Sequence, residues 1–286
     1  MSQAKVIFAD SKKLTEILPE KSVDLVVTGP PYWNEVVYSN DDGQLSKIKD
    51  YQEFLLELSE VWLGCSKVLK EGGILALWVH DFLREDRDSL FKYTPFHSDI
   101  LKTFDDSLTL RNVYVWDRYL NKDRGQISNL GHGIGTRVQY ILILQKKGQS
   151  QNEDKIKESL RRIYWEPVWY KKTAPKFLGS TTLFKAIFGI GKLTGFKSLG
   201  ASLQKIKAVK DGYKFGSYPT ECPEDVSRML IELFSSPGDT VLDPFAGSGT
   251  TLKSAVNLKR HSIGIEINKN SEKAIRDKLG GLVTFC

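Results

Sequence analysis

The sequence predicts an α/β protein built on a doubly wound, mostly parallel sheet, with a basic region inserted into it. Two observations carry this prediction. Short apolar runs typical of buried parallel strands alternate with stretches of helical spacing toward both ends of the chain. Between residues 146 and 215 this alternation breaks down and basic residues accumulate. The chain has 286 residues, which is long enough to bury a large core.

Strands and helices alternate through the first 145 residues. We expect helices at 12–18, 51–69 and 99–104, and we expect Gly72-Gly73 to end the second of them. We expect strands at 5–9, 23–28, 74–79, 111–116 and 138–144. The second and third strands are almost continuously apolar, as in a parallel strand buried on both faces. The last two suit an antiparallel edge of the sheet.

Regular order resumes after the basic region. We expect helices at 224–234, 251–258 and 271–279, and strands at 240–242 and 263–267. Residues 1–145 and 216–286 are therefore expected to be two halves of one domain, and residues 146–215 an insertion between them.

The basic region stands out because the rest of the chain is mildly acidic. From Lys146 to Gly216 there are sixteen Lys and Arg residues against five Asp and Glu, although the whole chain has a net charge of only +6. Such a segment is the electrostatic signature of a polyanion partner. A solvated lysine-rich loop region is the alternative.

Composition excludes several classes of protein. The hydrophobic share of 41% and the charged share of 27% argue against disorder, and no apolar run is long enough to span a bilayer. The three cysteines and four histidines show no ligand spacing, so we expect no metal. Charged residues near the start of the chain and unpaired cysteines favour a cytoplasmic setting.

A glycine-rich loop follows the predicted strand at 240–242 and opens the next helix. It reads Asp243-Pro244-Phe245-Ala246-Gly247-Ser248-Gly249-Thr250. Glycines let the backbone approach a ligand closely, and the helix N-terminus offers unpaired N–H groups. Glu266 ends the next strand, 23 residues after Asp243, where an acid can accept hydrogen bonds from ribose hydroxyls. The pattern indicates a nucleoside cofactor.

A second loop follows the predicted strand at 23–28. It reads Thr28-Gly29-Pro30-Pro31-Tyr32-Trp33 and lies where open α/β sheets place their ligands. The prolines stiffen the turn and leave carbonyl oxygens available as acceptors. Carbonyls that hold the hydrogens of an exocyclic amino group help to localise its lone pair. The two aromatic rings can stack on a base taken out of the duplex.

Together the two loops resemble those of the S-adenosylmethionine-dependent DNA amino-methyltransferases, which make N6-methyladenine or N4-methylcytosine. The order of catalytic loop, basic region and cofactor loop is similar to the circularly permuted β-class arrangement, in which the target-recognition region lies between the two halves. The resemblance covers residues 4–145 and 216–279. It implies S-adenosylmethionine as cofactor, no metal, and double-stranded DNA as partner. A cognate restriction endonuclease and a homodimer remain open.

The resemblance also assigns roles to particular residues. It implies that the catalytic loop is Thr28 to Trp33 as quoted above. It implies that the cofactor contacts Asp10, Ser217, Tyr218, Pro219, Asp243, Phe245, Gly247, Ser248, Gly249, Thr250 and Glu266. We expect DNA to be bound by basic side chains before a glycine-rich loop and within the basic region: Arg118, Lys122, Arg124, Arg161, Arg162, Lys171 and Lys172.

One residue departs from the family pattern. The catalytic signature usually begins with Asp, Asn or Ser, whose side chain accepts a hydrogen bond from the target amino group, and here that position is Gly29. The Thr28 hydroxyl, the main-chain carbonyls of Gly29 and Pro30, or a water are candidate substitutes. The loop is most similar to the Thr-Ser-Pro-Pro-Tyr-Trp type, which favours N4 of cytosine over N6 of adenine. A catalytically inactive DNA-binding module and an RNA or protein methyltransferase are the alternatives.

Overall fold

A computed structural model describes residues 2–33, 43–85, 91–117, 138–150, 152–164, 168–170 and 223–286. Within these residues the strands are β1 Ala4–Phe8, β2 Val23–Thr28, β3 Leu69–Val79, β4 Phe82–Glu85, β5 Phe91–Thr94, β6 Leu108–Asp117, β7 Val138–Lys146, β8 Val168–Tyr170, β9 Thr240–Asp243, β10 His261–Glu266 and β11 Val283–Phe285. The α-helices are α1 Leu14–Ile17, α2 Tyr51–Val68, α3 Phe96–Asp99, α4 Glu153–Tyr164, α7 Glu224–Phe234, α8 Thr250–Asn257 and α9 Glu272–Leu279.

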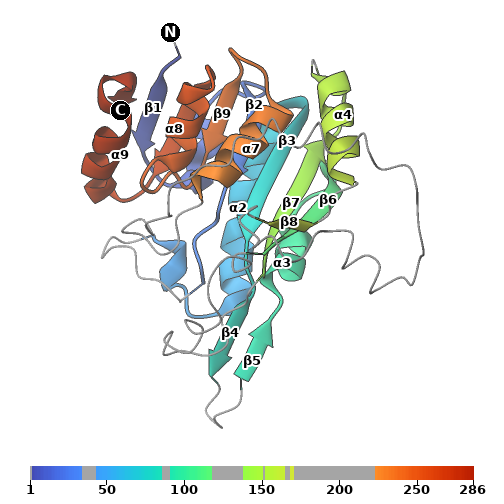
Figure 1. Cartoon of the computed structure of the whole chain (residues 1–286). Coiled ribbons are helices and arrows are strands. Elements are labelled where there is room, and N and C mark those ends of the chain that lie inside the picture. Colours follow the sequence, from blue (N-terminus) through green and yellow to red (C-terminus); the bar gives the residue numbers. More distant parts are fainter. Residues whose placement is uncertain are drawn as a thin grey trace, which may run out of the picture.

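The main sheet of the described residues has the strand order β11-β1-β10-β9-β2-β3-β7-β6-β8 (Figure 1). The six strands from β11 to β3 run parallel to their neighbours. β7 is antiparallel to both β3 and β6, and β8 pairs parallel with β6. The predicted doubly wound, mostly parallel sheet with an antiparallel edge is confirmed.

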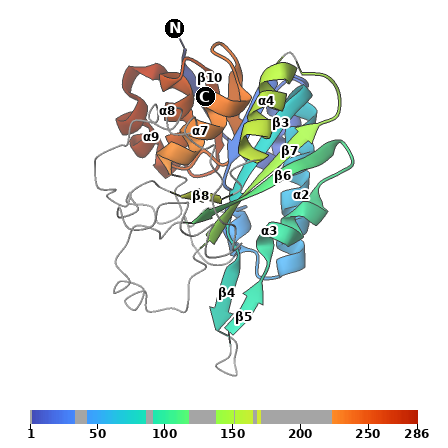
Figure 2. The same cartoon turned by 45° about the vertical axis from the view of Figure 1, so that its right-hand side comes forward.

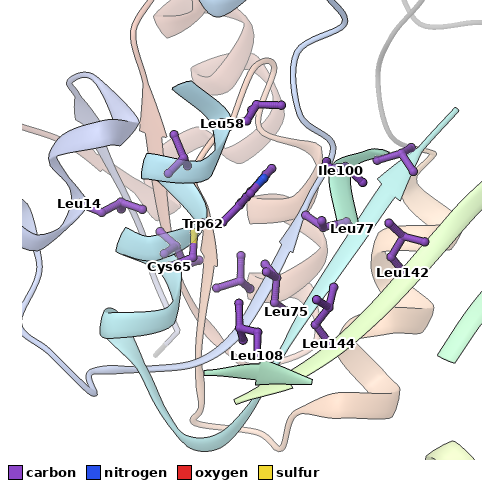
Figure 3. Close-up of a cluster of buried hydrophobic side chains, with 14 of the residues drawn as sticks. Leu14, Leu58, Trp62, Cys65, Leu75, Leu77, Ile100, Leu108, Leu142 and Leu144 are labelled. Carbon is purple, nitrogen blue, oxygen red and sulfur yellow. The ribbon is translucent and has the colours of Figure 1, made fainter. Parts of the chain in front are cut away.

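Helices cover both faces of this sheet (Figures 1 and 2). On one face, Trp62 of α2 packs among the apolar side chains of β3 and β7, together with Leu14 of α1 and Ile100 after α3 (Figure 3). On the other face, α4, α7 and α8 pack on the alternate residues of the same strands. Because each central strand is buried on both sides, its sequence is apolar throughout rather than alternating.

The two halves of the chain form one sheet, because β9 and β10 from the C-terminal half lie between β1 and β2 from the N-terminal half. The start of the basic region also packs on this core. Ser159 Oγ of α4 donates to the main-chain carbonyl of Leu233 in α7 at 2.7 Å. Asn152 Nδ2 donates to Asp239 Oδ2 at 2.9 Å.

The role predicted for Gly72-Gly73 was wrong, although the second helix ends only one residue before its predicted end. α2 ends at Val68, β3 begins at Leu69, and Gly72-Gly73 lie within that strand. Gly72 has φ +68°, and a Cβ on it would lie 2.4 Å from Ser150 N. The glycine is therefore needed for a close approach between two chain segments and not for a helix cap. The β4–β5 hairpin and the edge strand β11 were not predicted.

Candidate cofactor and active site

Four predicted site residues lie at one edge of the sheet. β1, β10, β9 and β2 are consecutive parallel strands, and Asp10, Glu266, Asp243 and Thr28 stand at or just after their carboxyl ends. Phe8 of β1 is paired with Glu266, which fixes Asp10 near that carboxylate. Open α/β sheets bind ligands at this edge, where the strand order reverses.

The cofactor loop has the backbone geometry that a closely approaching ligand requires. Gly247 and Gly249 have φ values of +51° and +83°, which a side chain at either position would disfavour. Among the described residues, a Cβ on Gly247 would meet only the Phe245 carbonyl oxygen, at 3.8 Å. Gly249 is the N-cap of α8, whose first N–H groups point toward the loop.

Two predicted residues of the cofactor loop accept hydrogen bonds from a lysine of α9. Lys278 Nζ donates to Ser248 Oγ at 2.6 Å and to Thr250 Oγ1 at 2.7 Å. Sequence reasoning missed Lys278, since a lysine on a surface helix has no local signal for such a contact. The two hydroxyls stabilise the loop in this structure.

Glu266 joins the cofactor loop to the next strand. Its Oε2 accepts from the backbone N–H of Gly247 at 2.7 Å, and its Oε1 accepts from Asn268 N at 2.7 Å. Burial raises the pKa of Glu266, while these backbone donors oppose that rise. A carboxylate fixed in this way keeps lone pairs for the hydroxyls of a ribose. These residues fit a nucleoside cofactor.

The turn that contains Asp10 also contacts this region, through Ser11. Asp10 Oδ1 accepts from Lys12 N at 3.0 Å, and the adjacent Ser11 Oγ donates to the main-chain carbonyl of Pro244 in the cofactor loop. The turn after β1 is thereby fixed to the loop after β9.

Asp243 links the cofactor loop to the catalytic loop. Thr28 Oγ1 donates to Asp243 Oδ1 at 2.6 Å, and Phe245 N donates to the same oxygen at 3.0 Å. Thr28 and Asp243 are only 1% and 4% exposed, respectively. Burial raises the pKa of Asp243, and the Thr28 and Thr251 hydroxyls oppose that rise. In this structure the Thr28 hydroxyl holds the two loops together.

The aromatic rings of the catalytic loop are packed against residues that follow β3. Tyr32 is 2% exposed, and its ring lies 4.0 Å from that of His80 and 6.3 Å from that of Phe82, between centroids. Trp33 lies 4.7 Å from Tyr51 and 6.4 Å from Phe82. The Tyr32 ring is therefore buried against His80 and Phe82 in this structure.

A buried carboxylate lies beside this loop. Asp81 follows His80 directly and its side chain is fully buried. It accepts hydrogen bonds from the Tyr93 hydroxyl of β5 and from His97 N at 2.9 Å, and the His97 Nδ1 lies 2.7 Å from its Oδ1. The His97 ring stacks on Tyr140 of β7. Asp81 thus fixes the β4–β5 hairpin and α3 next to the catalytic loop.

Several predicted site residues lie outside the described residues. They are Ser217, Tyr218 and Pro219 for the cofactor, and Arg118, Lys122, Arg124, Lys171 and Lys172 for DNA. Arg161 and Arg162 lie in α4, but their side chains are not described. No group of His, Cys, Asp and Glu in the described part of the chain could hold a metal ion. No described helix is long and apolar enough to cross a membrane.

The fold and the two loops define the class of nucleoside-cofactor α/β enzymes, and comparison with known proteins defines the family. The family model of the N6/N4 DNA methylases matches residues 23–277, so the chain belongs to this DNA methylase family. The resemblance inferred from the two loops, to S-adenosylmethionine-dependent DNA amino-methyltransferases, is thereby confirmed.

Individual relatives cover nearly the whole chain. The type II methyltransferase M.MjaI of Methanocaldococcus jannaschii is 30% identical over 96% of this chain and 91% of its own length. The DNA adenine methyltransferase YhdJ of Escherichia coli is 28% identical over 92% of this chain and 78% of its own. The structure of a DNA modification methylase from Thermus thermophilus with S-adenosyl-L-methionine, TTHA0409, has a TM-score of 0.63 at 26% identity, covering 99% of both chains.

Proposed function

We propose that this enzyme transfers a methyl group from S-adenosylmethionine to the exocyclic N4 of cytosine in double-stranded DNA. The observation that carries the proposal is the hydrogen bond between Thr28 and Asp243, because it joins the catalytic loop to the cofactor loop at one edge of the sheet. A transferase must align its donor and acceptor, and a direct link between their two loops does this.

The residues of the site then have distinct roles. Glu266 and Asp10 stand at neighbouring strand ends where the ribose and adenine of the cofactor would bind, and Gly247 leaves room for the methionine part. Bound S-adenosylmethionine supplies a methyl group already activated on a sulfonium. Main-chain carbonyls of the catalytic loop are proposed to hold the hydrogens of the target amino group, since Gly29 offers no side chain.

The preference for cytosine rests on the catalytic loop, which is most similar to the Thr-Ser-Pro-Pro-Tyr-Trp pattern. The likeness to YhdJ, named as an adenine methyltransferase, supports N6 of adenine as the second candidate. Gly29 supports a third candidate, an inactive module that keeps the fold and binds DNA.

We propose that DNA is read by the inserted basic region, residues 146–215. α4 packs on the core at the start of this region. Residues 171–216 carry ten lysines and one acidic residue, Asp211. Their charge suits the phosphate backbone, which dominates the affinity of proteins for DNA. The type II methyltransferase name of M.MjaI supports a role in restriction and modification, with a cognate endonuclease as partner.

The test is methyl transfer to DNA that carries no methylated bases. PCR-amplified genomic DNA is incubated with the enzyme and labelled S-adenosylmethionine, then digested to nucleosides and analysed by mass spectrometry. N4-methylcytosine supports the proposal, and N6-methyladenine selects the second candidate. DNA binding without either product selects the inactive module.

A further inference from the structure

Gly29 lies beside a buried tryptophan of the neighbouring strand. Thr28 of β2 is paired with Leu77 of β3, so the next residue along each strand brings Gly29 next to Trp78. A Cβ placed on Gly29 would lie 3.1 Å from Trp78 Cε3 and 3.3 Å from the Trp78 main-chain oxygen. Both distances are shorter than ordinary van der Waals contact, and one of the two atoms belongs to the backbone of a central strand.

The indole cannot easily move aside to admit a side chain. Trp78 is 2% exposed and belongs to the core under α7. Its Nε1 donates to Gln139 Oε1 of β7 at 2.9 Å, and Gln139 is itself 1% exposed. The tryptophan donor fixes the orientation of the Gln139 amide, because only the amide oxygen can accept this hydrogen bond.

The hydrogen bonding of the Gln139 amide shows that the contact with Trp78 has an energetic cost. With its oxygen committed to Trp78, Gln139 Nε2 is buried without a hydrogen-bond partner among the described residues. An unsatisfied buried donor destabilises the folded state, and such a group in a native structure calls for an explanation. Orientation of the Trp78 ring against the catalytic loop supplies one.

We propose that Trp78 is a positioning residue of the catalytic loop, and that Gly29, Trp78 and Gln139 act as one unit. The indole fills the space that a side chain at position 29 would need and fixes the backbone of that loop. The main-chain carbonyls of the catalytic loop can then hold the target amino group without a side-chain acceptor. This inference rests on the proposed methyltransferase function. It implies that restoring the usual serine at position 29 is unfavourable while Trp78 remains.

The experiment is a double-mutant cycle on the full chain, with Gly29→Ser, Trp78→Leu and the double variant. PCR-amplified DNA and labelled S-adenosylmethionine give kcat and the KM for S-adenosylmethionine, and thermal unfolding gives Tm. Ile74→Ala is the matched control, because Ile74 is a buried residue on the same face of the same strand, in its middle, and four positions before Trp78. Gln139→Met tests the orienting hydrogen bond.

Overpacking by the serine is expected to lower Tm by roughly 2–10 °C and to lower kcat. Trp78→Leu is expected to lower kcat about ten-fold with little change in the KM for S-adenosylmethionine, whereas Ile74→Ala lowers Tm and leaves kcat within about two-fold. Gln139→Met is expected to lower kcat, as Trp78→Leu does. The kcat of the double variant should be at least five-fold higher than the value expected if the effects of the two single substitutions were independent.

Two results would overturn the inference while the wild-type enzyme is active. One is independence of the Gly29 and Trp78 effects in both kcat and Tm. The other is a loss of kcat in Ile74→Ala as large as that in Trp78→Leu. A wild-type enzyme that transfers no methyl group to DNA contradicts the proposed function itself, which is a different outcome.

Discussion

Replacement of Thr28 by valine tests the link between the two loops. Valine has nearly the same shape and lacks the hydroxyl that donates to Asp243 at 2.6 Å. A hydrogen bond to a charged group contributes about 1.5–3 kcal/mol, and we expect a loss of unfolding free energy in this range because both residues are buried. Asp243 keeps its donors from Phe245 and Thr251.

The loss in Thr28→Val should depend on pH. Burial raises the pKa of Asp243 and the Thr28 hydroxyl opposes the rise, so the substitution raises this pKa further. The hydroxyl stabilises the ionised carboxyl, so its contribution is present above the folded-state pKa of Asp243. It is lost as pH falls through that pKa, where the folded state takes up a proton.

Urea unfolding followed by tryptophan fluorescence, at pH 8 and at a series of lower pH values, measures this effect. Thr28→Ser is the control, because it keeps the hydroxyl and loses one buried methyl group, about 0.8 kcal/mol at any pH. Methyl transfer by Thr28→Val should fall about ten-fold, since the loops lose their direct link. Equal destabilisation by valine and serine at every pH would show that the Thr28 hydroxyl does not stabilise the ionised carboxyl of Asp243.

Three further predictions concern the surroundings of the site. Glu266→Gln should weaken binding of S-adenosylmethionine about 10–100-fold, as measured by calorimetry. Because burial raises the pKa of Glu266, the affinity of the wild-type enzyme for S-adenosylmethionine should fall as pH drops through that pKa. The affinity of the variant should not depend on pH in this way. Gly264→Ala should cost about 1–3 kcal/mol of stability and weaken cofactor binding, because its Cβ would lie 2.8 Å from that of Ala246. Gly281→Ala should change neither, because its Cβ would have no described atom within 4 Å apart from its chain neighbours. Asp81→Asn should lower the unfolding free energy by about 1–3 kcal/mol and reduce kcat more than cofactor affinity; an unchanged kcat would contradict its role beside the catalytic loop.

The sheet could be predicted well because its signals are local. The run from Val23 to Val27 is apolar except for Asp24, and the structure has the predicted strand from Val23 to Thr28. Asp243 and Glu266 stand at the carboxyl ends of two neighbouring parallel strands, each of which was predicted. The ends of the helices α7 and α9 were equally clear, since their apolar spacing stops at Phe234 and Leu279.

The features that sequence reasoning missed depend on register or on distant partners. A glycine after a helical segment usually indicates the end of the helix, but Gly72 is needed because the backbone of Ser150, far along the chain, passes close to it. Tyr32 was expected to offer an open face, but His80 and Phe82 from another strand end cover it. The contact of Trp78 with Gly29 requires the β2–β3 register, which a single sequence does not give.

Mass analysis of nucleosides can show whether this enzyme transfers a methyl group to an amino nitrogen of DNA. After incubation with S-adenosylmethionine, PCR-amplified DNA should contain N4-methylcytosine, and Glu266→Gln should form less of it at equal cofactor concentration. The absence of both N4-methylcytosine and N6-methyladenine, with a wild-type protein that is folded and binds S-adenosylmethionine, would contradict the central claim.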